Sequence, residues 1–225
     1  MKENFRIGIL FVLMLLCVSP TACEPIQKTI SYEAYVPFYL DPKEKYPMVL
    51  LLSPTGDGPA LIPLWKDAAD HLGWILIASK DHKNGIDYRY LLPRLHRTIE
   101  AAIKKYPVDT RRIIVSGMSG GGMSSHTMAY TYPELVSAIV VNTGMMSEFF
   151  KDKEATYPRG KVAVFLASPT NFRYDEMQSD KEMLDRLEWK TKWIEFEGGH
   201  VPAPIEDYMQ AAEWINDQFK ISHKQ

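Results

Sequence analysis

The segment GMSGGG at residues 117–122 is the part of this 225-residue chain whose residue types and spacing best suit chemistry. It contains the pattern G-x-S-x-G, which follows the apolar run IIV at 113–115 and precedes a segment with a helical pattern. In a strand–turn–helix context, this pattern holds the serine in a strained turn with its hydroxyl exposed as a nucleophile. Crowding in the turn excludes side chains at Gly117 and Gly121, and the Gly120 N–H can stabilise an oxyanion. The same glycines would also suit a helix start packed tightly on a sheet.

A serine nucleophile needs a general base to take its proton. For this kind of turn, the serine is followed along the chain by an acid and then by a histidine. Only His200 and His223 lie late enough, and His223 belongs to the polar tail. His200 follows the short run Trp193–Phe196 through two glycines. We therefore predict His200 as the base, the alternative being an ordinary surface loop histidine.

The four remaining histidines are weaker candidates. His71 and His96 fall in helical patterns and should be half-exposed. His126 lies on the helix after Ser119, where it either packs or lines the floor of a site. His82 follows the end of a predicted strand and remains a secondary site candidate.

The elements that must position these residues alternate along the chain. Short, continuously apolar runs such as Pro47–Leu52 are typical of buried parallel strands. The pattern predicts strands at 30–39, 47–52, 74–78, 112–116, 136–141, 162–167 and 193–196, and helices at 61–72, 88–105, 120–130, 174–189 and 205–219. Such alternation predicts one α/β domain over residues 23–225, with a mostly parallel central sheet and helices on both faces. The catalytic partners should then lie in loops at the carboxyl ends of the strands.

The composition limits the classes of partner. Hydrophobic residues make up 46% and charged residues 24% of the chain, and the net charge is −2. These values are ordinary for a globular protein. Because there is no basic stripe, nucleic acid is not an expected partner.

The N-terminal residues 1–22 have the pattern of an export signal. Lys2 and Arg6 precede an apolar stretch, Ile7–Val18, which is too short for a comfortable transmembrane helix. The chain has two cysteines, and Cys17 should leave with this leader. Cys23, at its end, resembles the lipidated first residue of a bacterial lipoprotein. The alternative is an ordinary secreted protein cleaved near Ala22.

Four segments together resemble a known family. They are Tyr35-Val36-Pro37, Lys45-Tyr46-Pro47, the Gly117–Met123 turn and Gly198-Gly199-His200. From about Ile30 to Phe219, the chain resembles the α/β-hydrolases of the polyhydroxybutyrate-depolymerase and feruloyl-esterase-like branch. The resemblance implies a serine hydrolase that needs no metal or nucleotide. Ser119 would attack an ester carbonyl, His200 would move the proton, and an acyl-enzyme would form and be hydrolysed.

The acid of the triad is open between two positions. The resemblance places it in the loop after strand 162–167, where the motif position falls on Asn171. Asp175 lies four residues further on and carries the charge that stabilises an imidazolium, although it can also be an N-terminal helix residue. We place Asp175 slightly ahead of Asn171, with Glu148 third.

The oxyanion loop also departs from the family pattern. Where such enzymes often have His-Gly, this chain has SPTGDG at 53–58, and Pro54 has no N–H to donate. We therefore expect Gly120 and either Thr55 or Gly56 as the oxyanion donors. Asp57 is best explained as a solvated turn residue.

These features predict an exported serine hydrolase that cleaves carboxylic esters, such as acyl or feruloyl esters of polysaccharide. The alternative is a hydrolase-fold binding protein at the cell surface, its catalysis weakened by Asn171. The pairs Met145-Met146 and Phe149-Phe150 either line an apolar acyl pocket or pack in the core. The expected partner is a small-molecule or polysaccharide-linked ester, with contact to a membrane only through a lipid on Cys23.

Overall fold

A computed structural model describes residues 31–222 of the chain. The predictions for the leader, for Cys17 and Cys23, and for His223 lie outside the described residues. No described helix combines the length and apolar character needed to cross a bilayer.

The described residues form one seven-stranded sheet with the strand order β1-β3-β2-β4-β5-β6-β7. All neighbouring strands are parallel except β1, which pairs antiparallel with β3. The strands are β1 Tyr32–Tyr35, β2 Tyr46–Leu52, β3 Ile75–Ser79, β4 Val108–Met118, β5 Ala138–Asn142, β6 Val162–Ala167 and β7 Lys190–Glu195. The predicted mostly parallel sheet is confirmed, and β4 begins at Val108 rather than at Arg112.

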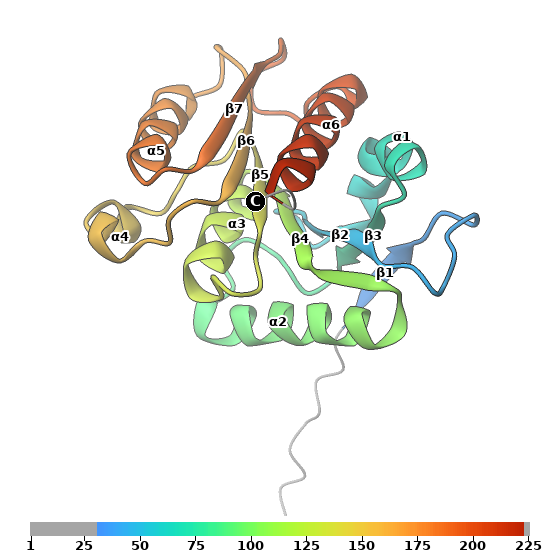
Figure 1. Cartoon of the computed structure of the whole chain (residues 1–225). Helices are drawn as coiled ribbons and strands as arrows, with labels where there is room; N and C mark the ends of the chain where they lie inside the picture. The colour runs from blue at the N-terminus through green and yellow to red at the C-terminus, as the bar shows by residue number, and fades with distance from the viewer. Residues whose placement is uncertain (1–30, 223–225) are drawn as a thin grey trace, which may run out of the picture.

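Helices cover both faces of the sheet (Figure 1). Helices α2 (Tyr88–Lys105), α3 (Gly120–Thr131) and α5 (Tyr174–Arg186) pack on one face, and α1 (Ile62–Leu72) and α6 (Ile205–Ser222) on the other. Side chains along β2 alternate between the two cores and are fully buried on both sides. This two-sided burial explains why the strand has a continuous apolar run.

Three short elements have no counterpart in the predictions. They are η1 (Pro59–Leu61), α4 (Glu148–Lys151) and η2 (Glu154–Thr156). Each is shorter than the windows over which helical periodicity can be recognised.

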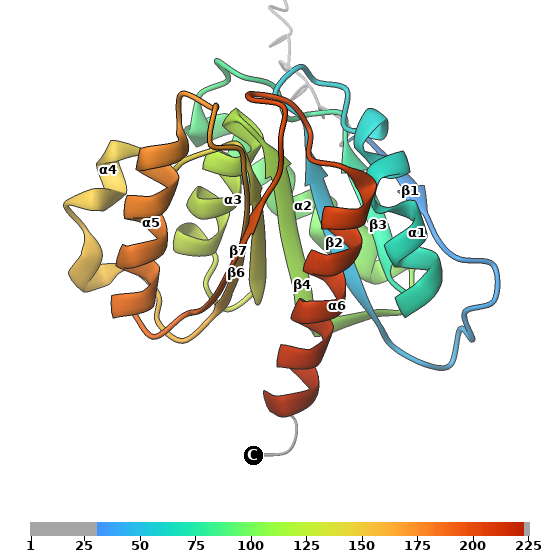
Figure 2. The same ribbon diagram turned by 90° about the horizontal axis from the view of Figure 1, so that it is seen from above.

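The loops after β6 and β7 reach the same edge of the sheet as the turn from β4 into α3 (Figure 2). Because parallel strands place their carboxyl ends at one edge, residues far apart in sequence meet there. This edge carries the candidate site.

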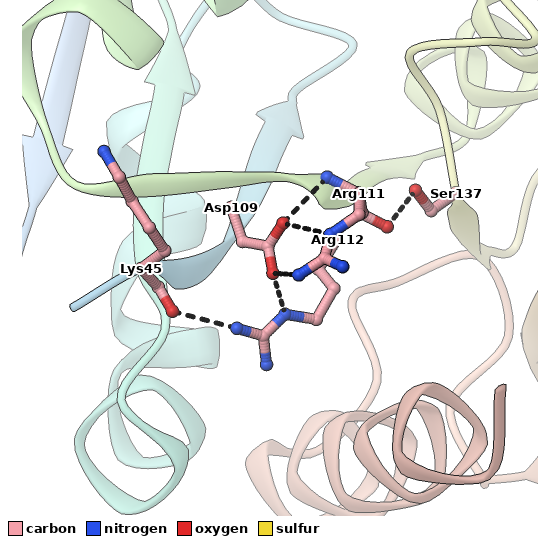
Figure 3. Close-up of polar contacts among 5 residues, drawn as sticks. All are labelled: Lys45, Asp109, Arg111, Arg112 and Ser137. Atoms are coloured by element: carbon pink, nitrogen blue, oxygen red, sulfur yellow. Dashed lines mark hydrogen bonds and ion pairs between the residues drawn. The ribbon is translucent and has the colours of Figure 1, made fainter. Parts of the chain in front are cut away.

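A network of hydrogen bonds and ion pairs around Asp109 stabilises the start of β4 (Figure 3). The carboxylate of Asp109 accepts the backbone N–H of Arg111 at 3.0 Å and the Nε–H of Arg112 at 2.8 Å. Arg112 also donates to the Lys45 carbonyl at 2.9 Å, and Ser137 donates to the Arg111 carbonyl at 2.7 Å. Burial alone would raise the pKa of Asp109, but the two arginines hold it below its ordinary value. The network therefore ties the start of β4 to the residues directly before β2 and β5.

Replacing this carboxylate should destabilise the fold. We expect Asp109→Asn to lower the free energy of unfolding by about 1–3 kcal/mol, because a buried charged hydrogen-bond acceptor is lost. A lowered pKa means that the carboxylate stabilises the fold above its unfolded pKa and that this contribution is lost as the pH falls. The difference between the two proteins, measured by urea unfolding, should therefore shrink in acid. Asp217→Asn, which alters an exposed pair with Lys220, is the control and should change stability by less than about 0.5 kcal/mol. Equal effects of the two substitutions at neutral pH would contradict this role.

Candidate active site

The turn between β4 and α3 has the strained geometry that its sequence predicts. Ser119 has a φ of 54°, an uncommon value for a residue with a side chain. A Cβ at Gly117 would lie 2.2 Å from the Gly121 carbonyl carbon, and one at Gly121 would lie 2.0 Å from the Leu52 carbonyl oxygen. Both glycines are therefore required by close backbone contact, as predicted. The turn presents the Ser119 hydroxyl at the start of α3.

Ser119, His200 and Asn171 form a continuous hydrogen-bonded line. The distance from Ser119 Oγ to His200 Nε2 is 2.9 Å, and that from His200 Nδ1 to Asn171 Oδ1 is 3.0 Å. Because a carboxamide oxygen only accepts, His200 Nδ1 carries the proton. The lone pair on Nε2 is then free to accept the Ser119 proton, which is the arrangement that a general base needs.

Asn171, and not Asp175, is the partner of His200. Asp175 is exposed in the first turn of α5, and Glu148 is paired with Lys151 at 2.8 Å. The loop after β6 closes through the Asn171 N–H and the Ser168 carbonyl at 2.9 Å, so that residue 171 meets the histidine before the helix begins. The preference for Asp175 was therefore wrong, because it weighted charge above position in the loop.

The surroundings of Asn171 fix which end of its carboxamide faces His200. Oδ1 also accepts the backbone N–H of Arg173 at 3.3 Å, while Nδ2 lies 3.9 Å from the Met177 sulfur. A flipped amide would place two N–H groups against the Arg173 N–H and offer Met177 an oxygen. The asparagine thus selects the productive tautomer of His200 without supplying a negative charge.

The imidazole of His200 is held in its neutral form. Burial lowers the pKa of His200, and the positive charge of Arg173 lowers it further. The exposed Phe172 ring packs against the imidazole with 4.6 Å between centroids. A histidine acts as a general base only when it is unprotonated. The lowered pKa therefore lets His200 act as a base at pH values below the ordinary titration range of histidine.

The pH dependence of catalysis should show this effect. We expect the acid limb of kcat/KM to lie below pH 6.5, and Arg173→Gln to move it to higher pH by removing the nearby charge. The substitution keeps the backbone N–H that orients Asn171. Arg159→Gln, which alters a surface pair with Glu188, is the control for a change in net charge. Coincident profiles of the Arg173 variant and the parent enzyme would contradict the assignment.

Asn142 joins the serine and histidine segments, and the sequence analysis missed it. Its backbone carbonyl accepts the Ser119 N–H at 2.9 Å. Its side-chain oxygen accepts the Ala203 N–H at 3.2 Å and the Tyr208 hydroxyl at 2.9 Å. The signal that could have revealed it is a polar residue at the end of an otherwise apolar strand.

The serine and histidine open into a cavity of about 360 Å³. Gly120 and Met145 also line it, whereas Met146 and Phe150 are core residues and Phe149 is exposed. Of the predicted acyl-pocket pairs, therefore, one methionine reaches the cavity. No group of three or more His, Cys, Asp or Glu side chains within residues 31–222 is arranged to hold a metal ion.

The predicted second oxyanion donors, Thr55 and Gly56, do not line this cavity. The Thr55 N–H is directed at Ser53 Oγ, 3.4 Å away. The chain after β3 lies against this turn, since Asn84 N–H donates to the Pro54 carbonyl at 2.9 Å. The cavity is lined instead by this loop, from His82 to Ile86, which sequence patterns did not reveal.

His82 and His126 are both buried, but only His82 lies at the cavity. His82 lines the cavity, and burial lowers its pKa. His126 is fully buried away from the cavity wall, and burial lowers its pKa to about 3. His126 therefore packs, and of the secondary candidates only His82 belongs to the site.

Known proteins resemble this chain in structure over most of its length, but in sequence only over a short stretch. No protein-family model matches the chain. Acetylxylan esterase A of Aspergillus awamori is 42% identical over 48 residues, which are 21% of this chain and 16% of that protein. A probable acetylxylan esterase A of Aspergillus clavatus is 38% identical over 52 residues, 23% of this chain and 17% of that protein. The matched stretch is thus a small part of each relative.

Solved structures resemble the chain over most of its length. Esterase PE8 has a TM-score of 0.67 at 16% identity, with 84% of this chain and 98% of that chain covered. The carboxylesterase of Bacillus cereus has a TM-score of 0.65 at 16% identity, covering 85% and 95% of the two chains. YahD, solved with malic acid, has a TM-score of 0.64 at 16% identity, covering 84% and 99%. Together with the sheet order and the turn at Ser119, these likenesses show that the chain has the α/β-hydrolase fold.

Proposed function

We propose that this protein is a serine esterase that hydrolyses carboxylic esters through an acyl-enzyme on Ser119. The observation that carries the proposal is the line from Ser119 Oγ through His200 to Asn171 at 2.9 and 3.0 Å, open to a cavity. The acetylxylan esterases and carboxylesterases among the similar proteins support it.

The geometry supports a two-step reaction. Ser119 Oγ attacks the ester carbonyl carbon while His200 Nε2 takes its proton, and the carbonyl electron pair moves onto the oxygen. The resulting oxyanion lies beside the Gly120 N–H at the start of α3. When the oxyanion collapses, the carbon–alkoxy bond breaks and His200 gives the proton to the leaving alcohol. Water then repeats the sequence on the acyl-enzyme and releases the acid.

The size of the cavity supports a substrate with a short acyl group. A volume of about 360 Å³ lies at the small end of ligand pockets, and it suits a short acyl group better than a long chain. The acetylxylan esterase relatives favour acetyl groups on polysaccharide, and feruloyl esters remain the second choice from the branch resemblance.

A panel of esters combined with active-site labelling tests the proposal. We expect acetyl esters of p-nitrophenol and acetylated xylan to be hydrolysed, and a fluorophosphonate probe to label the protein on Ser119. Methyl ferulate distinguishes the feruloyl alternative. Absence of both hydrolysis and labelling would overturn the esterase proposal.

A second function has one observation in its favour, the neutral Asn171 in place of a carboxylate. A hydrolase-fold binding protein would retain the cavity and bind esters with little turnover. Tight ester binding without turnover, converted into hydrolysis by Asn171→Asp, would establish this alternative.

We also propose that the protein is exported and held to a membrane through a lipid on Cys23. The apolar leader that ends at this lone cysteine supports the proposal. Mass spectrometry of the mature N-terminal peptide should show a lipid-modified Cys23. A soluble mature form with an unmodified Cys23 would reject the anchor but not export.

A further inference from the structure

A side chain at Gly120 would have to displace the Asn84 carboxamide. A Cβ on Gly120 would lie 1.9 Å from Asn84 Oδ1 and 3.1 Å from Asn84 Nδ2. The turn at Ser119 does not itself account for this glycine, since its crowding falls on Gly117 and Gly121. The Asn84 carboxamide therefore sits against the residue that supplies the first oxyanion donor.

Two hydrogen bonds hold the loop that carries Asn84 against the turn after β2. The Asn84 N–H donates to the Pro54 carbonyl at 2.9 Å, and His82 Nδ1–H donates to the Ser53 carbonyl at 2.6 Å. Because Nδ1 donates, the neutral His82 ring accepts at Nε2 from the Ser124 hydroxyl, 2.8 Å away on α3. His82, at 1% exposure, thus fastens the loop of Asn84 to both the turn after β2 and the helix of the nucleophile.

The carboxamide itself has its hydrogen-bonding capacity unused. Among residues 31–222, the Asn84 side chain makes no hydrogen bond, and it is exposed on the wall of the cavity that holds Ser119. In the structure Asn84 Oδ1 lies nearer to Gly120 than Nδ2 does, and rotation about the last side-chain bond would exchange the two atoms and direct Nδ2–H beside the Gly120 N–H. Thr55 and Gly56, the alternative sources of a second donor, do not line the cavity.

We propose that Asn84 Nδ2 donates the second hydrogen bond to the oxyanion, beside the Gly120 N–H, and that His82 is the positioning residue for its loop. The proposal rests on the esterase function proposed above and assigns a further catalytic residue for it. As Ser119 Oγ bonds to the carbonyl carbon, the electron pair moving onto the carbonyl oxygen is met by two N–H donors. Both hydrogen bonds weaken again when the oxyanion collapses and the alcohol leaves. The interaction belongs to the transition state, so its loss should affect kcat and not KM.

The first test removes the donor. Asn84→Ala, and Asn84→Asp with a similar shape but no donor, should each lower kcat for p-nitrophenyl acetate about 10²- to 10³-fold with little change in KM. The thermal unfolding temperature should stay that of the parent enzyme, because the side chain makes no hydrogen bond to the described fold. A kcat within about twofold of the parent enzyme in both variants would overturn the proposal and return the role to Thr55 or Gly56.

The second test uses the contact between Asn84 and Gly120. Gly120→Ala keeps the backbone N–H but places a methyl group where the carboxamide lies, so it should also lower kcat. In the Asn84→Ala background that space is vacant, and the added methyl should cost much less, which makes the double-mutant cycle strongly non-additive. Full additivity of the two substitutions would mean that they act independently and would contradict displacement of Asn84.

The positioning role of His82 has its own readout. His82→Asn places an amide N–H near the position of Nδ1 and should preserve the bond to the Ser53 carbonyl. His82→Phe removes that donor, and it should lower kcat without raising KM. Equal kcat values in the Asn and Phe variants would contradict a positioning role.

Failure of this inference and failure of the proposed function give different results. If the parent enzyme hydrolyses esters through Ser119 and the Asn84 variants keep its kcat, only the assignment of Asn84 falls. If the parent enzyme neither hydrolyses esters nor reacts with a fluorophosphonate probe, the esterase proposal falls, and the role of Asn84 falls with it.

Discussion

Ser119→Ala should lower ester hydrolysis by about 10⁴- to 10⁶-fold and abolish fluorophosphonate labelling. The substitution removes the hydroxyl that lies 2.9 Å from His200 Nε2, so no acyl-enzyme can form at residue 119. The fold should survive, because the strained φ of residue 119 is imposed by the glycines around it and not by the hydroxyl. Initial rates with p-nitrophenyl acetate, together with a thermal unfolding scan, measure both expectations.

A matched serine provides the control for this substitution. Ser125 lies six residues further along the chain, within α3, is fully buried and donates to the Gly121 carbonyl at 3.0 Å. Ser125→Ala should therefore affect stability and leave labelling of Ser119 intact. Labelling that persists on a different serine in Ser119→Ala would remove Ser119 from the mechanism.

Asn171→Asp should raise kcat, by about 10- to 10³-fold. In the serine-protease case, where the aspartate is replaced by asparagine, about 10⁴-fold is lost, partly because the asparagine holds the wrong tautomer. Here the Arg173 N–H already turns the Asn171 oxygen toward His200, so the tautomer is productive and only the charge is missing. The gain should accordingly be smaller than that loss.

The same substitution should move the pH profile in a defined direction. A carboxylate beside His200 stabilises the imidazolium and raises the pKa of the histidine. The acid limb of kcat/KM should then shift to higher pH while the plateau rises. Asp175→Asn, on the exposed first turn of α5, is the control and should change neither quantity. A lower plateau in Asn171→Asp would show that the neutral amide is itself required.

The strands and helices were predictable because their patterns are local. The apolar runs of β2 and β6 and the apolar face of α2 are recognisable in the sequence. The turn at Ser119 is recognisable from the glycines that its crowding requires. The parallel order then follows from strand–helix alternation, since crossover connections place the carboxyl ends of the strands at one edge.

The partner of His200 was not settled by local pattern. Choosing between Asn171 and Asp175 depends on where α5 begins after the loop, and helix boundaries are poorly determined by sequence. The chemistry of a charged partner favoured Asp175, but the loop closes four residues earlier. The backbone geometry of the loop determines which residue contacts His200, and that residue is Asn171, whose side chain is an amide.

The contact between Asn84 and Gly120 could not be predicted from the sequence, for a different reason. Asn84 lies in the loop after β3 and Gly120 begins α3 after β4, and these two strands are separated in the sheet by β2. No spacing along the sequence records such a contact. The only sequence trace of it is Gly120 itself, the first of three consecutive glycines, at a position that the G-x-S-x-G pattern leaves open.

The most direct test of the account is the mass of the protein trapped during turnover. We expect acid quenching of the enzyme mixed with p-nitrophenyl acetate to reveal a single added acetyl group, located by peptide mapping on Ser119. The Ser119→Ala protein should gain none. Continued hydrolysis by the parent enzyme with no acetyl group on Ser119, or with the acetyl group on another residue, would contradict the acyl-enzyme mechanism at the centre of the account.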